Sequence, residues 1–229
     1  IGEALSDIAN IYLYKNDTAA FHEYMNKSLA IYFEIKDTVF IVNGYRRLNI
    51  YYLSIGNFQQ ALRSIQSAIE VSKEMNYKKG EALSLAQLGD MYRDNGENVQ
   101  ALENYRNSLS ILNETKDTND LFNVLAAVGG FYYTLHNTDK ALEYYNKLIA
   151  ICNSKQDIDH NVGSVYKWIG LVYRDNNDFR NSLLYFEKSL AVFDSTKNQW
   201  QPKDVLDEMG IVYNRQGDFV KAIECHLKS

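Results

Sequence analysis

Residues 85–105 read LAQLGDMYRDNGENVQALENY, and variants of this stretch recur along the chain. The recurrence is easiest to follow at its central tyrosine, which has equivalents every 40 or 41 residues: Tyr12, Tyr52, Tyr92, Tyr132, Tyr173 and Tyr213. A fixed period of this size indicates one supersecondary unit repeated six times, each unit burying its apolar face against the next. The period therefore predicts an elongated repeat array.

Apolar side chains precede each tyrosine at helical spacing. Four residues before Tyr92 lies Leu88, three before that lies Leu85, and the other units keep large, mostly apolar residues at both places. Offsets of 3, 4 and 7 residues define one stripe of a helix. A second helix follows, with a small residue at Ala101 and a bulky one at Tyr105, and similar residues in most other units. Each unit is thus predicted to be two antiparallel helices.

A small residue recurs inside the first helix. It is present in every unit except one, where Asn49 takes its place: Ala9, Gly89, Gly129, Gly170 and Gly210. Glycine costs a helix about 1 kcal/mol relative to alanine, so its recurrence indicates close approach by the second helix. Ala101 and its equivalents are expected to lie opposite this small position.

The turn between the two helices has a regular composition. Four residues after each tyrosine lies a residue type that tolerates positive φ: Asn16, Gly56, Gly96, His136, Asn177 and Gly217. The next residue is Asp or Asn in five units and is expected to cap the second helix: Asp17, Asn57, Asn137, Asp178 and Asp218.

Leu88, Gly89, Tyr92, Ala101 and Tyr105 together resemble the tetratricopeptide repeat, a helix-turn-helix unit. The resemblance covers essentially the whole chain, although Leu or Tyr replaces the family's common Trp. The period of 40 residues, rather than about 34, is similar to that of kinesin light chain and of bacterial regulators that sense short peptides. The resemblance implies one all-α domain, a right-handed solenoid of about twelve antiparallel helices. Its six repeats are expected at approximately 2–41, 42–81, 82–121, 122–162, 163–202 and 203–229.

The resemblance also implies that the first helices line a concave face that binds a peptide or protein segment. Positions opposite the packed stripe give the expected ligand-binding residues: Asn10, Asn43, Arg46, Asp90, Arg93, Asn123, Tyr133, Lys167, Arg174 and Asn214. Asn donates to and accepts from a peptide backbone, and Arg pairs with carboxylates. Asp90 and Arg93 lie three residues apart on one helix, so mutual pairing is an alternative to ligand contact.

Composition narrows the function classes. The net charge is −5 with no basic block, which argues against nucleic-acid binding. No apolar run approaches the roughly 18 residues that span a bilayer. Cys152 and Cys225 are too far apart to form a disulfide framework, which favours a reducing compartment such as the cytoplasm.

Motifs for chemistry are incomplete. His22-Glu23 begins like a zinc-protease motif, but Asn26 stands where the second histidine is required. Residues 157–160 hold two aspartates and a histidine without a calcium loop, so capping of the next helix is the expected role. His226 occupies a core position and is expected to be packed. We therefore expect no catalytic residue, no metal and no cofactor.

The most economical function is a non-catalytic protein- or peptide-binding module, the sensor or interaction domain of a larger regulatory or signalling protein. The chain begins at Ile1 and stops inside a helix at Ser229, so we expect it to be a piece of a longer protein. One alternative is a structural scaffold. Another is a homodimer formed through uncovered terminal helices, since Ile223 and Leu227 have no following repeat. A third is the regulatory half of a phosphatase-like modulator of response regulators.

Overall fold

Twelve α-helices form the computed structural model, which describes residues 1–15, 17–154, 160–195 and 201–229. In chain order they are α1 (Gly2–Tyr14), α2 (Thr18–Glu34), α3 (Thr38–Ser54), α4 (Phe58–Glu74), α5 (Lys78–Asp94), α6 (Asn98–Thr115), α7 (Thr118–Thr134), α8 (Thr138–Ser154), α9 (His160–Asp175), α10 (Phe179–Ser195), α11 (Gln201–Gln216) and α12 (Phe219–Lys228). These ranges contain no β-strand. The predicted all-α helical-repeat fold is confirmed.

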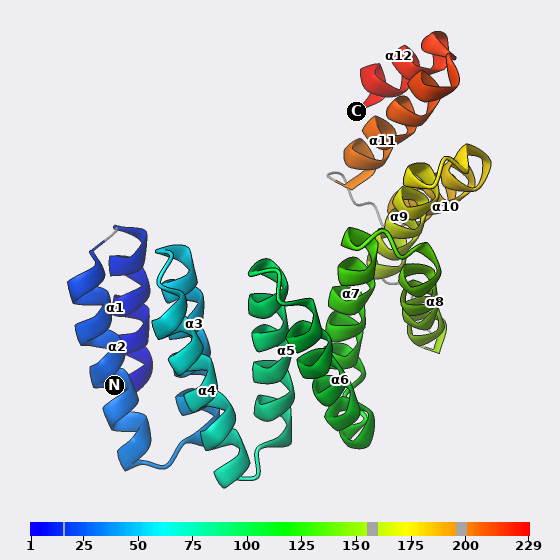
Figure 1. Ribbon diagram of the computed structural model, residues 1–229. Coiled ribbons are helices and arrows are strands. Elements are labelled where there is room, and N and C mark those ends of the chain that lie inside the picture. The colour runs from blue at the N-terminus through cyan, green and yellow to red at the C-terminus, as the bar shows by residue number, and fades with distance from the viewer. Residues whose placement is uncertain (16, 155–159, 196–200) are drawn as a thin grey trace. The chain divides into compact units, whose positions relative to one another are not determined.

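Consecutive helices pack as antiparallel pairs within two compact units, Ile1–Leu121 and Phe122–Ser229. In the first unit α1 packs on α2, α3 on α4 and α5 on α6, and in the second α9 packs on α10 and α11 on α12 (Figure 1). The odd-numbered helices are called A helices below, and the even-numbered ones B helices. The A helices of repeats two to six begin two to four residues before the approximate repeat starts expected from the period.

The turn from each A helix to its B helix is closed by the repeated tyrosine. In all six repeats the tyrosine carbonyl accepts a hydrogen bond from the backbone N–H five residues later, at 2.8–3.0 Å. This is a helix C-cap in which one residue takes a left-handed conformation. The predicted positive φ is confirmed, at 54–80°, for Gly56, Gly96, His136, Asn177 and Gly217, while Asn16 lies outside the described residues.

The predicted caps of the B helices are also confirmed. The side chain accepts a hydrogen bond from the backbone N–H three residues later, at 3.1–3.2 Å, for Asp17, Asn57, Asn137, Asp178 and Asp218. The sixth position is Glu97, whose side chain makes no cap bond. Its carboxylate instead accepts from Gln100 Nε2 at 3.1 Å.

The small position of the A helix receives a ring from the B helix of the same repeat. A Cβ added to Gly89 would lie 2.8 Å from Tyr105 Cδ1, and one added to Gly129 would lie 2.5 Å from Tyr145 Cε1. The same pairing joins Gly170 to Phe186 and Gly210 to His226. The predicted close approach is present, and equivalents of Ala101 do meet the small position: Ser182 Oγ donates to Gly170 O, and Asn49 Nδ2 donates to Ala61 O, both at 2.9 Å. The ring was not predicted. The ring one turn further along fills the recess that the missing Cβ leaves.

Buried hydroxyls join the start of the A helix to the B helix in three repeats. Each serine Oγ donates to a backbone carbonyl 26 residues earlier at 2.7 Å: Ser28 to Gly2, Ser108 to Ala82 and Ser189 to Gly163. Neighbouring repeats then stack, for example through the rings of Phe21 and Tyr51, whose centroids are 4.2 Å apart. A helices of successive repeats also contact one another, α3 with α5 and α9 with α11. Polar side chains on these helices therefore lie within reach of the next repeat.

Candidate binding face of the A helices

The predicted ligand-binding residues are distributed over the A helices. They are Asn10 on α1, Asn43 and Arg46 on α3, Asp90 and Arg93 on α5, Asn123 and Tyr133 on α7, Lys167 and Arg174 on α9, and Asn214 on α11. Hydrogen bonds and ion pairs gather seven of them into local groups, each inside one unit.

The first group, the α3–α5 cluster, consists of Asn43, Arg46, Asn49 and Gln87. Arg46 Nε donates to Gln87 Oε1 at 3.1 Å, and Arg46 Nη1 lies 3.4 Å from Asn43 Oδ1. Gln87 Nε2 donates to Arg46 O at 3.0 Å and to Asn49 Oδ1 at 2.6 Å. Burial lowers the pKa of the Arg46 guanidinium, which nevertheless stays protonated at neutral pH. The cluster therefore bridges two repeats with one positive charge among neutral amides.

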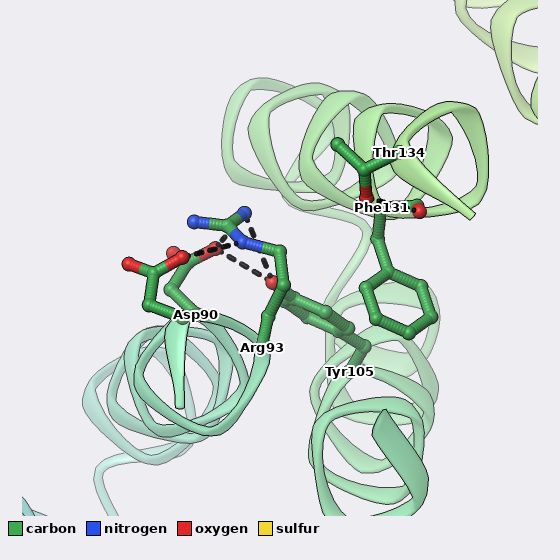
Figure 2. Close-up of polar contacts among 6 residues, drawn as sticks. Asp90, Arg93, Tyr105, Phe131 and Thr134 are labelled. Atoms are coloured by element: carbon green, nitrogen blue, oxygen red, sulfur yellow. Dashed lines mark hydrogen bonds and ion pairs between the residues drawn. The ribbon is translucent and has the colours of Figure 1, made fainter. Parts of the chain in front are cut away.

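The second group, the α5–α6 cluster, consists of Asp90, Arg93, Asp94 and Tyr105. Arg93 donates to Asp90 through Nη1 and to Asp94 through Nε, both at 2.8 Å, and the Tyr105 hydroxyl donates to Asp90 Oδ1 at 2.6 Å (Figure 2). Burial and the Asp90 carboxylate raise the pKa of Tyr105 far above its usual range, so it remains a donor. The pairing of Asp90 with Arg93, expected as an alternative to ligand contact, is present.

The third group, the α7–α9–α11 cluster, consists of Tyr133, Arg174, Asp175 and Glu208. The Tyr133 hydroxyl donates to Asp175 Oδ2, Arg174 Nε donates to Asp175 Oδ1 at 2.8 Å, and Arg174 Nη1 pairs with Glu208. Burial and the bond to Asp175 raise the pKa of Tyr133 to about 12. Burial would raise the pKa of Asp175, but the bonds from Arg174 and Tyr133 lower it overall. The cluster ties three successive A helices of the second unit.

A small pocket lies beside this cluster. It encloses about 90 Å3 and is lined by Tyr133, His136, Thr138, Val172, Asp175 and Asn176. It lies between the α7–α8 turn and the last turn of α9.

The remaining predicted residues differ in their contacts. Lys167 Nζ lies 3.4 Å from Asp204 Oδ2, which links α9 to α11. The side chains of Asn10, Asn123 and Asn214 form no hydrogen bond with any described residue. Asn123 and Asn214 are exposed and Asn10 is half-buried.

The two histidines considered for metal binding or catalysis, His22 and His226, contact other side chains of the chain. His22 packs between the rings of Tyr51 and Tyr52, at centroid distances of 5.0 and 5.1 Å, and burial lowers its pKa. His226 lies against Gly210, but its side chain is 48% exposed rather than buried in the core as expected, and its Nδ1 lies 3.1 Å from Asp207 Oδ1. The acidic stretch at 157–160 lies outside the residues whose side chains are described. Elsewhere in the described chain, no three His, Cys, Asp or Glu side chains gather as a metal site would require.

Several residues of these clusters were not predicted from the sequence: Asn49, Gln87, Tyr105, Asp175 and Glu208. For two of them, a feature of the sequence could have indicated the contact. Asn49 is the exception in the row of small residues, and Gln87 follows Arg46 by 41 residues, one repeat period. Polar residues one period apart on A helices meet across a repeat boundary, which is the pattern that would have found Gln87.

The sequence matches a known family model. The profile of the tetratricopeptide repeat family matches residues 80–154 and 120–195, which together cover about half of the chain. No curated protein matches the sequence. In the described part of the chain, no helix has both the length and the apolar character that crossing a membrane requires.

Solved structures share the fold at low identity. BtubC (BKLC) from P. vanneervenii is 18% identical with a TM-score of 0.74, and the match covers 98% of this chain and 87% of that one. A STAND protein with a tetratricopeptide repeat sensor from Pyrococcus horikoshii is 17% identical with a TM-score of 0.71, covering 100% of this chain and 34% of that one. A Rap protein complexed with Competence and Sporulation Factor is 17% identical with a TM-score of 0.64, covering 99% and 62%. The repeated helix pairs and the sequence match lead to one conclusion: the chain belongs to the tetratricopeptide repeat family.

Proposed function

We propose that this chain is a non-catalytic module that binds a protein or an extended peptide segment, and that it serves as the sensor or interaction domain of a larger regulatory or signalling protein. Membership of the tetratricopeptide repeat family supports this proposal. Two proteins of similar fold point the same way, since one carries a repeat sensor and the other was solved with a bound factor.

The observation that carries the proposal is the set of unengaged amides on the A helices. Asn10, Asn123 and Asn214 make no hydrogen bond with the described residues, although each amide has two donors and an acceptor. An extended peptide presents unpaired N–H and C=O groups at regular intervals. Asparagine side chains satisfy both kinds of group, so these three residues suit contact with a peptide backbone.

Selection from a phage-displayed library of short random peptides tests the proposal. We expect peptides that bind the wild-type chain. Those that bind the second unit should lose at least about fivefold in affinity with Asn123→Ala/Asn214→Ala, and those that bind the first unit should lose affinity with Asn10→Ala, since each lost hydrogen bond is worth about 0.5–1.5 kcal/mol. The matched control is Asn26→Ala/Asn146→Ala, which removes two exposed amides from B helices. Selected peptides that bind both variants as tightly as wild type would show that the face is wrongly assigned.

Self-association through the terminal helices is a second candidate. On α12 the side chains of Ile223 and Leu227 are 59% and 82% exposed. Exposed neighbouring apolar side chains favour association. Sedimentation over a concentration series would detect it, and the variant Ile223→Gln/Leu227→Gln should then remain monomeric. A chain that is monomeric at every concentration rules this candidate out.

A further inference from the structure

Arg46 differs from the other three cations of the candidate face. Each of the others has a carboxylate partner: Arg93 has Asp90 and Asp94, Arg174 has Asp175 and Glu208, and Lys167 has Asp204. Among the described residues Arg46 contacts only the neutral amides of Gln87 and Asn43. Asp120 attracts it from a longer distance, but that carboxylate forms its own ion pair with Lys79 at 2.6 Å. The half-buried charge of Arg46 is therefore the least compensated of the four.

The guanidinium is held by a chain of amide hydrogen bonds that starts in the core. Asn49 is fully buried, and its Nδ2 donates to Ala61 O at 2.9 Å, which directs its Oδ1 towards α5. That oxygen accepts from Gln87 Nε2 at 2.6 Å, and the same nitrogen donates to Arg46 O at 3.0 Å. Both amide protons of Gln87 are then used, so its Oε1 is left to accept from Arg46 Nε at 3.1 Å.

This arrangement engages only part of the guanidinium. Arginine has five N–H donors. The bond to Gln87 uses the Nε proton and the contact with Asn43 uses one Nη1 proton, so three donors on Nη1 and Nη2 have no described partner. Two parallel N–H groups of this kind match the two oxygens of a carboxylate.

We infer that Arg46 binds a carboxylate of the peptide ligand, with Gln87 and Asn49 acting as positioning residues. The inference rests on the proposed function and names the ligand chemistry that the first unit recognises. The carboxylate comes from an Asp or Glu side chain or from a peptide C-terminus. Arg93, Arg174 and Lys167, which are neutralised by the chain's own carboxylates, are structural in this assignment.

Arginine Nε–Hε signals in 15N NMR spectra of the full chain test the inference directly. The probes are N-acetylglutamic acid amide, N-acetylalanine and the neutral N-acetylglutamine amide. We expect the Arg46 signal, assigned by its loss in Arg46→Lys, to move saturably with one of the carboxylates and not with the neutral amide, while the Arg93 and Arg174 signals stay in place. The first two probes distinguish a side-chain carboxylate from a C-terminal one. An Arg46 signal that does not move, or that moves equally with the neutral probe, overturns the inference.

Two variants test the positioning chain and the link to peptide binding. Asn49→Gly restores the residue that other repeats carry at this position, and it should weaken carboxylate binding at least about threefold while the charge remains. Unchanged binding would remove Asn49 and Gln87 from the assignment.

Acidic peptides from the library selection should lose at least about tenfold in affinity with Arg46→Gln and little with Arg93→Gln. If peptides bind without any dependence on Arg46, this inference fails and the proposed function survives. If no peptide binds while the acetylated probes still move Arg46, the proposed function fails and the carboxylate site survives.

Discussion

At the scale of single residues, Gly129 and Gly130 are neighbours with different surroundings. A Cβ on Gly129 would lie 2.5 Å from the buried Tyr145 ring, whereas a Cβ on Gly130 would approach nothing closer than 4.0 Å. We expect Gly129→Ala to destabilise the chain by about 1–3 kcal/mol, because the packed ring has to move. Gly130→Ala should be neutral or stabilise by up to about 1 kcal/mol through helix propensity. Urea denaturation followed by circular dichroism measures both, and equal effects would contradict the ring-in-recess packing.

His22 makes stability depend on pH. Burial lowers its pKa in the folded chain, so the unfolded chain, in which the pKa is about 6.5, takes up the proton more readily. Its contribution is therefore complete above about pH 6.5 and decreases as the pH falls through that value towards the folded pKa. The free energy of unfolding of wild type minus that of His22→Gln should decrease between about pH 7.5 and pH 5. A difference that is constant or larger in acid contradicts this assignment.

At the scale of helices, the caps offer a comparison between repeats. Asp178 lies at the N-cap of α10, and its carboxylate accepts a hydrogen bond from Asn181 N at 3.1 Å. Glu97 lies at the N-cap of α6, but its side chain makes no capping hydrogen bond. We expect Asp178→Ala to cost about 1 kcal/mol and Glu97→Asp to add about 0.5 kcal/mol, because the shorter carboxylate reaches the N–H three residues on. Thermal and urea unfolding measure both changes. A destabilising Glu97→Asp would show that the contacts of Glu97 with its neighbours outweigh the cap.

The helix-level features followed from the sequence because they depend on local spacing. The 40-residue period, the left-handed turn residues and the five caps are all read from residue type and position. The ring that enters the recess at each of these glycines was not predicted in this way. Whether Ala101 or Tyr105 fills the recess at Gly89 depends on the direction of a side chain across two helices, which spacing along one helix does not fix.

At the scale of the whole molecule, Arg174 couples successive repeats of the second unit. It bonds Asp175 on α9 and Glu208 on α11, whereas Arg93 bonds carboxylates on its own helix. We expect Arg174→Gln to reduce hydrogen-exchange protection of α11 and α12 by about 1–3 kcal/mol, since a largely buried charged bond is lost. Arg93→Gln, which removes mainly contacts within α5, should leave the protection of its neighbouring repeats unchanged. Identical local effects of the two variants would argue against coupling through Arg174.

The contacts of the polar residues on the A helices were only partly predictable, because spacing along one helix does not fix contacts between repeats. Asp90 and Arg93 are three residues apart, so their pairing followed from helix geometry. Arg174 and Glu208 are 34 residues apart and belong to different repeats, so only the stacked structure brings them together. The choice of A-helix residues as a binding face remains a prediction, as does the single domain expected over 1–229.

The fit of a B-helix ring into an A-helix glycine has a consequence for the ancestry of the array. In four repeats the glycine and its ring belong to the same hairpin, as with Gly170 and Phe186. Gene duplication or recombination that moves a complete hairpin keeps both partners together. A crossover inside a hairpin separates them and sets a ring against a side chain. Chimeras joined between hairpins should therefore keep each glycine with its own ring and fold normally. Chimeras joined inside a hairpin should be destabilised.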